Sequence, residues 1–142
     1  MRFTVPGVPV AKAAPTHVPT ARGFRKKKDE KTDRFENRVA LAARQAGVPY
    51  IESGPVCLHV WAYFPSRNPP LKRGRRPKEW HTVRPDRTNI LKAVEDGLNG
   101  VAFKDDGQVV AGAAYKLRCA QGDAEGPRTE IEVSVVYETI LF

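Results

Sequence analysis

The segment PVCLHVWAYF, residues 55–64, constrains the fold more than any other stretch of this chain. It is rich in β-branched and aromatic residues, alternates in part between apolar and polar positions, and is followed by Pro65. These features predict a β-strand. Because a strand must pair with others and bury a face, the rest of the chain has to provide partner strands and a covering layer.

Four further segments have the pattern of strands. Residues 3–10 are predicted as an edge strand because of their prolines, and residues 129–137, TEIEVSVVY, alternate well. Residues 101–104 and 108–118 are predicted as two strands joined at Asp105-Asp106-Gly107. Asp-Gly is among the strongest signals for a tight hairpin turn, so a hairpin is expected there.

Two helices complete the pattern. The first is predicted to be capped by Asp33 and to stop at Gly47, and the second to cover residues 89–99 and to stop at Gly100. The order β-α-β-α-β-β-β predicts an α+β fold with a mixed, largely antiparallel sheet and two helices. Residues 1–142 are expected to form a single domain.

Basic residues gather in two segments that are predicted as flexible loops, near residues 11–32 and 66–85. The formal net charge is +8. Residues 22–34 carry seven Lys or Arg against three acids, and residues 67–87 carry eight against two. These clusters favour binding to the polyphosphate backbone of a nucleic acid, because each neutralised phosphate releases counterions.

Other classes of protein are disfavoured. No apolar run approaches the length that crosses a membrane, no basic amphipathic helix suggests a membrane surface, and the N-terminus does not have the pattern of a signal peptide. Cys57 and Cys119 lack metal-site spacing and are expected to be reduced thiols. We therefore expect a cytoplasmic protein without a membrane partner.

The candidate site lies between the second helix and the turn after it. Asp86 precedes the helix, Lys92 is on a side other than its apolar face, and Asp105 and Asp106 follow one short segment later. If the helix start and the turn meet at one sheet edge, Asp86 and Asp106 converge there. Carboxylates that hold Mg²⁺, with a lysine close by, are suited to phosphodiester hydrolysis.

Ordinary structural roles explain the same residues. Asp86, Thr88 or Asn89 is a suitable helix cap, and Lys92 could form a surface ion pair with Asp96 or Glu95. Spacing alone favours these roles.

Residues 84–110, RPDRTNILKAVEDGLNGVAFKDDGQVV, resemble the RusA family of Holliday junction resolvases, which is common in phages and prophages. Two groups of residues match the family signature: Pro85, Asp86, Asn89, Lys92, Asp96, Leu98, Asn99 and Gly100, followed by Asp105, Asp106 and Gln108. The resemblance implies a homodimer that depends on Mg²⁺, with Mn²⁺ as an expected substitute. It also implies that the enzyme nicks four-way DNA junctions symmetrically, in DNA recombination and repair.

The resemblance also assigns roles to residues. Asp86 and Asp106 are similar to the family's metal-binding catalytic aspartates, Lys92 to its catalytic lysine, and Asp105 to a neighbouring acid that helps to hold the metal. The chain departs from the family at Thr88, where the best-studied type of member has a second catalytic aspartate. Asn89 and Asp96 are expected to support the site with Thr88, and Asp96 either holds Lys92 or replaces the missing carboxylate.

The basic loop before the site is expected to hold the DNA backbone. The residues assigned to this role are Arg73, Arg75, Arg76, Lys78, Trp80, Arg84 and Arg87. The ring of Trp80 is suited to stacking on unpaired bases at a branch point. His81 lies in the same loop, where it could contact phosphate.

The sequence thus predicts a Mg²⁺-dependent endodeoxyribonuclease that resolves Holliday junctions. Two alternatives stay open. One is a nuclease that cuts a broader range of branched or flap DNA, and the other is a non-catalytic DNA-binding accessory protein of recombination, in which Thr88 marks a lost metal site.

Overall fold

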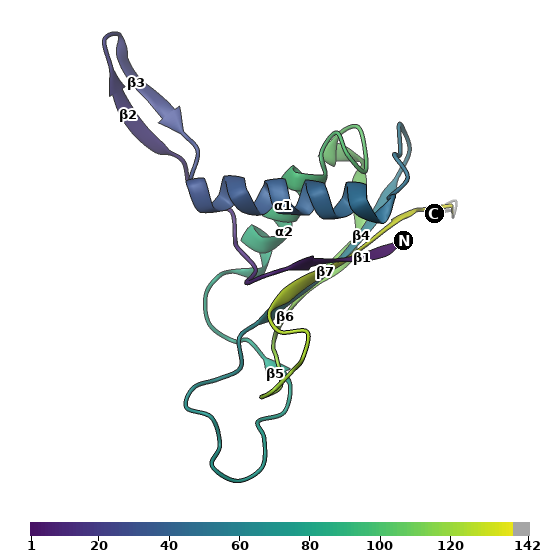
Figure 1. The fold of residues 1–142 in the computed structure, drawn as a ribbon. Helices are drawn as coiled ribbons and strands as arrows, with labels where there is room; N and C mark the ends of the chain where they lie inside the picture. Colours follow the sequence, from purple (N-terminus) through teal and green to yellow (C-terminus); the bar gives the residue numbers. More distant parts are fainter. Residues whose placement is uncertain (138–142) are drawn as a thin grey trace, which may run out of the picture.

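The computed structural model describes residues 1–137 of the chain and contains one central sheet, two helices and a projecting two-stranded arm (Figure 1). In chain order the elements are β1 (Arg2–Pro6), β2 (Thr16–Thr20), β3 (Gly23–Lys27), α1 (Glu30–Ala46), β4 (Val56–Phe64), β5 (Glu79–Trp80), α2 (Arg87–Leu98), the 3-10 turn η1 (Asp106–Gln108), β6 (Val109–Arg118) and β7 (Arg128–Val135).

The five strands of the central sheet lie in the order β1-β7-β4-β6-β5. β4 and β6 are parallel, whereas the pairs β1–β7, β7–β4 and β6–β5 are antiparallel. α2 belongs to the crossover that connects β4 to its parallel neighbour β6. These findings confirm the predicted α+β fold with two helices and a mixed, largely antiparallel sheet.

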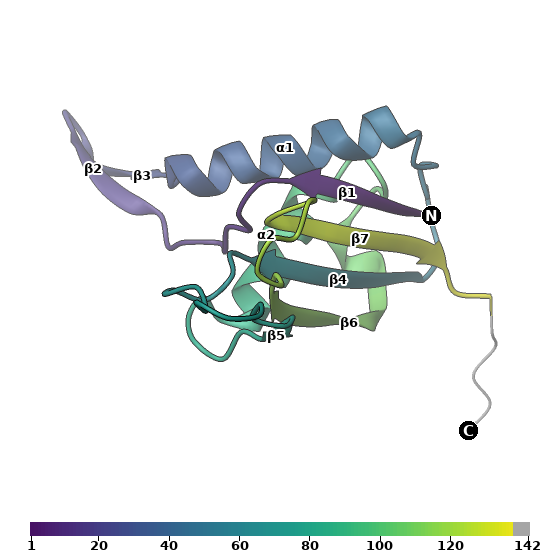
Figure 2. The ribbon, with the colours of Figure 1, turned by 60° about the horizontal axis from the view of Figure 1, so that its bottom comes forward.

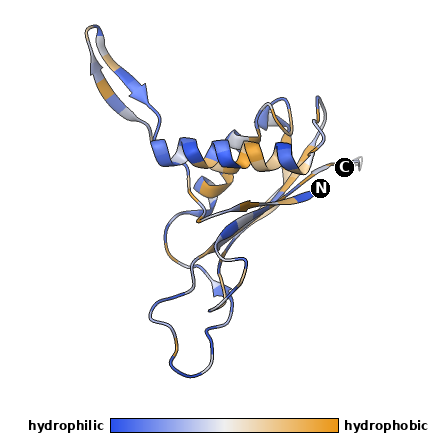
Figure 3. Ribbon diagram, viewed as in Figure 1, coloured by the Kyte–Doolittle hydropathy of each residue, from blue (hydrophilic) through white to orange (hydrophobic). Residues whose placement is uncertain are grey.

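Both helices cover the same face of the sheet (Figures 1 and 2). Along β4, Val56, Leu58 and Val60 are buried in a common core with side chains of α1 and α2, such as Phe35 and Ile90. The residues between them on β4 are half-buried, as a period of two requires. The hydropathy colouring of Figure 3 shows apolar residues gathered where the helices meet the sheet.

Gly97 allows the two helices to pack closely. A Cβ atom built at Gly97 would lie 2.9 Å from the backbone oxygen of Glu36 and 2.9 Å from the Cβ of Val39, both on α1. Since real Cβ atoms rarely approach other atoms so closely, only glycine fits without a shift of α1. This contact fixes the position of α2, which carries the candidate site.

Two predicted boundaries on the N-terminal side are wrong. Residues 16–27, expected in a flexible loop, form the β2–β3 hairpin. α1 starts earlier than predicted and is capped by Asp29, which accepts a 3.0 Å hydrogen bond from the backbone N–H of Thr32, rather than by Asp33. Both Asp29 and Asp33 are followed by helix-forming residues, so sequence alone does not distinguish the two caps.

The predicted hairpin around Asp106-Gly107 is also wrong. Residues 101–104 form no strand, and residues 106–108 form η1, which leads into β6. The segment is instead folded back on itself, with the N–H of Gly100 donating to the carbonyl of Phe103 at 2.8 Å and Phe103 fully buried. β6 pairs with the distant β4, so a local hairpin partner is not needed.

The basic loop after β4 contains the two-residue strand β5, which pairs with the end of β6. Cys57 is half-buried and Cys119 is buried, and both are free thiols. Neither helix in the part of the chain that the structure describes is long and apolar enough to span a bilayer.

The topology brings the two basic segments to the same end of the sheet. Because β1 and β4 both run antiparallel to β7, they point in the same direction and finish at the same end. The β2–β3 arm follows β1, and the loop of residues 65–85 follows β4. Figure 2 shows the arm and the loop projecting beyond this end of the sheet.

Candidate active site

The segment before α2 is held in place by one side chain of β6 and one of the basic loop. The Lys116 ammonium donates hydrogen bonds to the carbonyls of Val83 and Pro85, each at 2.7 Å, and His81 Nε2 donates to the carbonyl of Arg84 at 2.9 Å. Three consecutive carbonyls before Asp86 are therefore bound to side chains of the protein. Lys116 and His81 position Asp86, and the sequence pattern did not indicate this role for either residue.

Asp86 occupies the N-cap position of α2, as predicted, but its side chain makes no capping hydrogen bond to the helix. The side chain is exposed and borders a cavity of about 390 Å³. The cavity is lined by Ala11, Lys12, Ala13, Arg84, Pro85, Asp86 and Asn89. The Asp86 carboxylate is thus available to an external partner at the positive end of the helix dipole.

A second cavity, of about 570 Å³, lies next to that of Asp86, and both Lys92 and Asp106 line it. Its walls are formed by Lys12, Ala13, Ala14, Pro15, Asn89, Lys92, Glu95, Asp96 and Asp106. Three residues, Lys12, Ala13 and Asn89, border both cavities. The structure therefore brings Asp106 next to Lys92 and places Asp86 beyond a shared wall.

The expected meeting of Asp86 and Asp106 at one sheet edge is not what the topology provides. α2 starts after the end of β4, whereas η1 precedes β6, whose first residue pairs with the start of β4. Asp106 meets the later part of α2, close to Glu95 and Asp96. At 1.5 Å per residue, Asp96 lies about 15 Å along the helix axis from Asp86.

The N-terminal segment crosses α2 at the boundary of the two cavities. The backbone N–H of Lys12 donates to the carbonyl of Asn89 at 2.9 Å, and the Lys12 ammonium forms an ion pair with Asp96. Asp96 was expected either to hold Lys92 or to replace the missing carboxylate. The first alternative is wrong, because the ion-pair partner of Asp96 is Lys12. No local pattern indicates this pair, because the two residues are 84 positions apart.

Gln108 holds the segment that carries Asp105 and Asp106. Its side-chain oxygen accepts a 2.9 Å hydrogen bond from the N–H of Asp105, and its amide nitrogen donates to the carbonyls of Ile51 and Gly54, each at 3.2 Å. Gln108 thereby connects η1 to the segment before β4. The match of Gln108 to the family signature thus corresponds to a positioning role for its side chain.

The surroundings of Asp106 and Glu95 disfavour the ionised forms of these two side chains. A hydrogen bond with the Asp105 side chain raises the pKa of Asp106, and desolvation and the charges of Asp105 and Asp96 act in the same direction. Burial raises the pKa of Glu95, and the charges of Asp106 and Asp96 add to this, opposed by Lys92. A cation bound among these carboxylates would relieve the repulsion.

The donor atoms around the cavity suit Mg²⁺, which prefers carboxylate oxygens. Within residues 1–137, no three His, Cys, Asp or Glu side chains are close enough together to form a ready-made metal site. Mg²⁺ at phosphate-processing sites is commonly held by one or two carboxylates, with substrate phosphates and water completing its coordination. The carboxylates that line the cavity are therefore compatible with Mg²⁺.

Thr88 and Asn89 lie in the first turn of α2. Thr88 is exposed, and Asn89 is half-buried between the two cavities. Thr88 therefore faces solvent one residue before the position at which the N-terminal segment crosses the helix.

The predicted DNA-binding residues lie in or next to the loop after β4. Arg73, Arg75, Lys78, Arg84 and Arg87 are exposed, and the Trp80 side chain is 65% exposed. Arg76 is half-buried, and its Nε donates to the carbonyl of Pro69 at 2.8 Å, so it also holds the loop together. Arg84 borders the same cavity as Asp86, which connects the loop to the candidate site.

The suggested contact between His81 and phosphate is wrong. His81 is buried and stacks on Phe64, with ring centroids 4.1 Å apart. Burial lowers the pKa of His81, and the charges of Arg118 and Lys116 add to this effect. His81 is therefore a structural residue of the loop.

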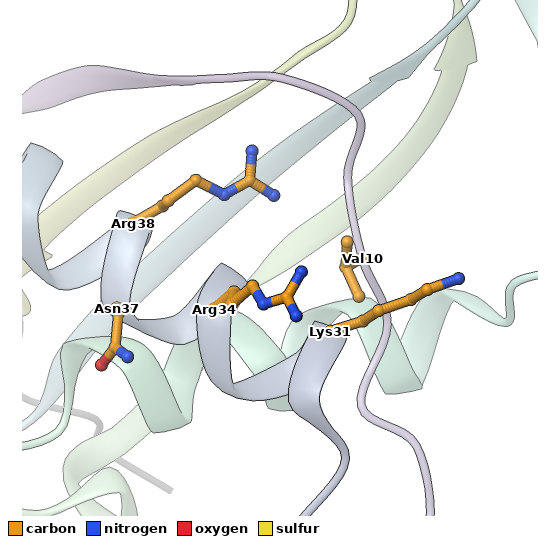
Figure 4. A pocket seen from close by; sticks show the side chains of 5 residues that line it. All are labelled: Val10, Lys31, Arg34, Asn37 and Arg38. Atoms are coloured by element: carbon orange, nitrogen blue, oxygen red, sulfur yellow. The ribbon is translucent and has the colours of Figure 1, made fainter.

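A third cavity, of about 530 Å³, lies between α1 and the segment after β1. Figure 4 shows Lys31, Arg34 and Arg38 extending from α1 on the side of Val10, with Asn37 also at the wall. Three cations thus follow one another along α1 from its first turn.

Comparisons with known proteins agree with this arrangement. The family described as endodeoxyribonuclease RusA matches residues 6–134 of the chain. A relative from Bacillus subtilis (strain 168), the uncharacterized protein YqaN, is 32% identical over 143 residues, and the match covers 96% of this chain and 96% of YqaN. The family match includes both cavities, the basic loop and η1, and it shows that the chain belongs to the RusA family of endodeoxyribonucleases.

Proposed function

We propose that this protein is a Mg²⁺-dependent endodeoxyribonuclease that resolves four-way DNA junctions by paired, symmetric nicks. One observation carries the proposal: Lys92 and Asp106, both expected to be catalytic, line one cavity together with further carboxylates. Family membership supports a nuclease. An exposed cavity lined by a lysine and several carboxylates is suited to a phosphodiester substrate. The lysine attracts the phosphate, and the phosphate oxygens can complete the coordination of a metal held by the carboxylates.

Asp106 and Asp105 are the carboxylates that would hold Mg²⁺ at the cavity of Lys92, and Asp86 is the carboxylate that would hold it at the neighbouring cavity. Mn²⁺ is expected to replace Mg²⁺. When bound, Mg²⁺ supplies Lewis-acid stabilisation of the negative charge that develops on the scissile phosphate. The raised pKa of Asp106 supports this assignment, because a cation would restore the ionised form of the crowded carboxylate.

Lys92 supplies a second positive charge at the same place. It is exposed on α2 and, among the described residues, it has no ion pair, whereas Lys12 in the same cavity is paired with Asp96. An unpaired ammonium can move onto a phosphate oxygen as charge develops there. We assign Lys92 to stabilisation of the transition state and Lys12 to the structure of the cavity wall.

The exposed cations of the loop after β4 would bind the DNA backbone and direct the strand into the cavity. Arg84 lies two residues before Asp86, and Arg87 follows Asp86 directly. Contacts of this kind fix the position of the substrate without reading its sequence. This agrees with selectivity for branched structure rather than for a base sequence.

Paired nicks require two active sites, since each site cuts one strand at a time. A homodimer with two-fold symmetry places one site on each side of a four-way junction, which has the same approximate symmetry. The charge of such a dimer would be 2 × (+8) = +16, which favours binding at a crossover of DNA strands.

The test is cleavage of a labelled panel that contains a four-way junction, a flap, a Y-shaped duplex and a linear duplex, each with Mg²⁺ and with EDTA. We expect paired nicks in the four-way junction, dependence on Mg²⁺ and slow cleavage of the other substrates. Similar rates on flap and junction would instead support the broader branched-DNA nuclease. Salt-sensitive binding with no product at any metal concentration would support the non-catalytic accessory protein.

A further inference from the structure

The β2–β3 arm is almost entirely exposed, and within the described residues Lys27 at its base forms a 3.8 Å ion pair with Glu30 of α1. All residues of β2 and β3 are exposed except Val18, which is half-buried. The arm projects from the N-terminal end of α1, away from the sheet (Figure 1). An isolated two-stranded hairpin is at best marginally stable in water, so a surface that binds it would add to its stability.

The charged side chains of the arm are all positive. From residue 16 to residue 28 it carries five cations and no acidic residue. These cations are Arg22, Arg25, Lys26, Lys27 and Lys28. A segment with this composition repels a second copy of itself and attracts a polyanion.

The cations lie on both faces of the ribbon. In the observed register Lys26 lies opposite His17 and Arg25 lies opposite Val18. Since neighbouring residues of a strand point to opposite faces, Arg25 and Lys27 share one face and Lys26 is on the other. A ribbon that carries cations on both faces can contact the two phosphate walls of one groove.

Phe24 adds an apolar group near the tip. Its side chain is 74% exposed and lies opposite Pro19, next to the turn at Ala21 and Arg22. Within the described residues, Phe24 belongs to neither apolar core. Base edges in the major groove offer apolar groups, such as the methyl group of thymine, that the ring can contact.

We propose that the β2–β3 arm is a second DNA-binding element, which enters the major groove of a duplex next to the branch point. This inference rests on the proposed function in one respect, namely that DNA is the substrate. The major groove is wide enough for a two-stranded ribbon. Arg25, Lys26 and Lys27 contact phosphates, and Phe24 contacts bases.

The position of the arm agrees with this role. Arm and basic loop leave the same end of the sheet, so one DNA molecule can contact both (Figure 2). Behind the arm, Lys31, Arg34 and Arg38 continue the basic surface along α1 (Figure 4). At 1.5 Å per residue, Lys31 and Arg38 are separated by about 10 Å along the axis, which is enough to contact successive phosphates.

The test is the salt dependence of junction binding, measured with EDTA so that no cleavage takes place. The variant R25Q/K26Q/K27Q removes three cations, and each lost phosphate contact lowers the slope of log K against log salt concentration by about 0.9. We expect the slope to fall by about 2 to 3 when two or three of these contacts are lost. Thermal unfolding should be unchanged, because the arm lies outside the core.

The control variant is R44E/Q45E, at the far end of α1, where both residues are exposed. The triple variant changes the net charge from +8 to 8 − 3 = +5, and the control also changes it by −3, by −2 at Arg44 and −1 at Gln45. We expect the control to keep a slope close to that of the wild type. Equal slopes for the triple variant and the control would overturn the proposal.

Phe24→Ala and Phe24→Tyr test the tip. The alanine variant should weaken junction binding by roughly tenfold, as expected when one aromatic side chain is no longer buried, and tyrosine should restore it. Wild-type affinity in Phe24→Ala would overturn the contact of Phe24 with bases. If the wild-type protein binds junctions but never cleaves them, the proposed function fails while these binding results still decide the role of the arm.

Discussion

Lys12 and Lys92 line the same cavity but have different surroundings. The Lys12 ammonium is paired with Asp96, and its backbone is bound to α2 through the carbonyl of Asn89. Lys92 is exposed and, within the described part of the chain, has no acidic partner within ion-pair distance. Lys12 therefore stabilises the wall of the cavity, whereas Lys92 is free to act on a substrate.

Replacing Lys92 by glutamine should therefore affect the chemical step. We expect the single-turnover rate on a four-way junction to fall by roughly 10²- to 10³-fold, as for the loss of one transition-state contact, while junction affinity changes little. Rapid-quench kinetics at saturating enzyme measures this rate. A variant that cleaves at the wild-type rate would remove Lys92 from the mechanism.

Thr88 leads to a prediction about the metal. The side chain is exposed in the first turn of α2, two residues after Asp86, so Thr88→Asp adds a carboxylate there and the helix dipole favours its charge. We expect the Mg²⁺ concentration for half-maximal cleavage to fall by roughly tenfold, because ligand charge tunes the affinity for hard cations. Thr82→Asp, in the exposed loop, is the control and should leave this concentration unchanged. An unaltered Mg²⁺ requirement in Thr88→Asp would show that no metal binds near Asp86.

His81 predicts a dependence of stability on pH. Its Nε2 donates to the Arg84 carbonyl, whereas Nδ1 is buried and has no hydrogen-bond partner among residues 1–137, so protonation would bury an unsatisfied N–H. Burial lowers the pKa of His81 in the folded state, so the unfolded state binds the proton more tightly. Stability is therefore fully present above the unfolded value of about 6.5 and is lost as the pH falls from there towards the folded pKa.

Chemical unfolding between pH 7.5 and 5.5 measures this effect. We expect the free energy of unfolding to fall with pH in the wild type and to fall less in His81→Gln. His17→Gln, which removes an exposed histidine of the arm, should behave like the wild type. Parallel pH profiles for the wild type and His81→Gln would contradict the assignment.

At the scale of elements, the contact between α1 and α2 sets the geometry of the site. Gly97→Ala places a methyl group 2.9 Å from the Glu36 carbonyl oxygen and from the Cβ of Val39. We expect a loss of about 1–3 kcal/mol in the free energy of unfolding, as for other overpacked contacts. Gln45→Ala, on the exposed side of α1, should change stability by less than about 0.5 kcal/mol. Denaturant unfolding of both variants measures the difference, and a Gly97→Ala variant as stable as the wild type would contradict the close contact.

The elements also show what sequence can predict. β4, β7 and α2 have clear apolar periodicity and Gly or Pro boundaries, and they occur close to their predicted places. The segment around Asp106 was predicted as a hairpin because Asp-Gly is a strong local signal, but the strand that follows it pairs with β4 from an earlier part of the chain. Local turn chemistry cannot indicate a parallel pairing across a helix.

Contacts between distant segments of the chain were also not predicted at the candidate site. The residues of α2 and η1 that line the cavities were identified from the sequence, as matches to a family signature. Lys12, His81 and Lys116, which hold those residues in place, come from three other segments, and each acts through contacts that only the folded chain creates. Glu95 was considered only as an ion-pair partner, and its place beside Asp106 depends on the position of η1.

For the whole molecule, the distribution of charge follows from the path of the chain. β1 and β4 end at one end of the sheet and continue into the arm and the basic loop. The acidic residues of α2 and η1 follow the basic loop in the sequence and line the cavity. Positive projections around a carboxylate-lined cavity suit a nuclease. The projections bind the backbone, and the carboxylates bind the metal that acts on it.

The most direct measurement is cleavage of an end-labelled four-way junction by the wild type and by Asp106→Asn under single-turnover conditions with Mg²⁺. Asp33→Asn, which changes an exposed carboxylate on α1, is the control. We predict paired, symmetric nicks by the wild type and the control, and a loss of at least about 10²-fold in rate for Asp106→Asn with junction binding retained. Equal cleavage by the wild type and Asp106→Asn, or no cleavage by the wild type at any metal concentration or pH, would contradict the proposal.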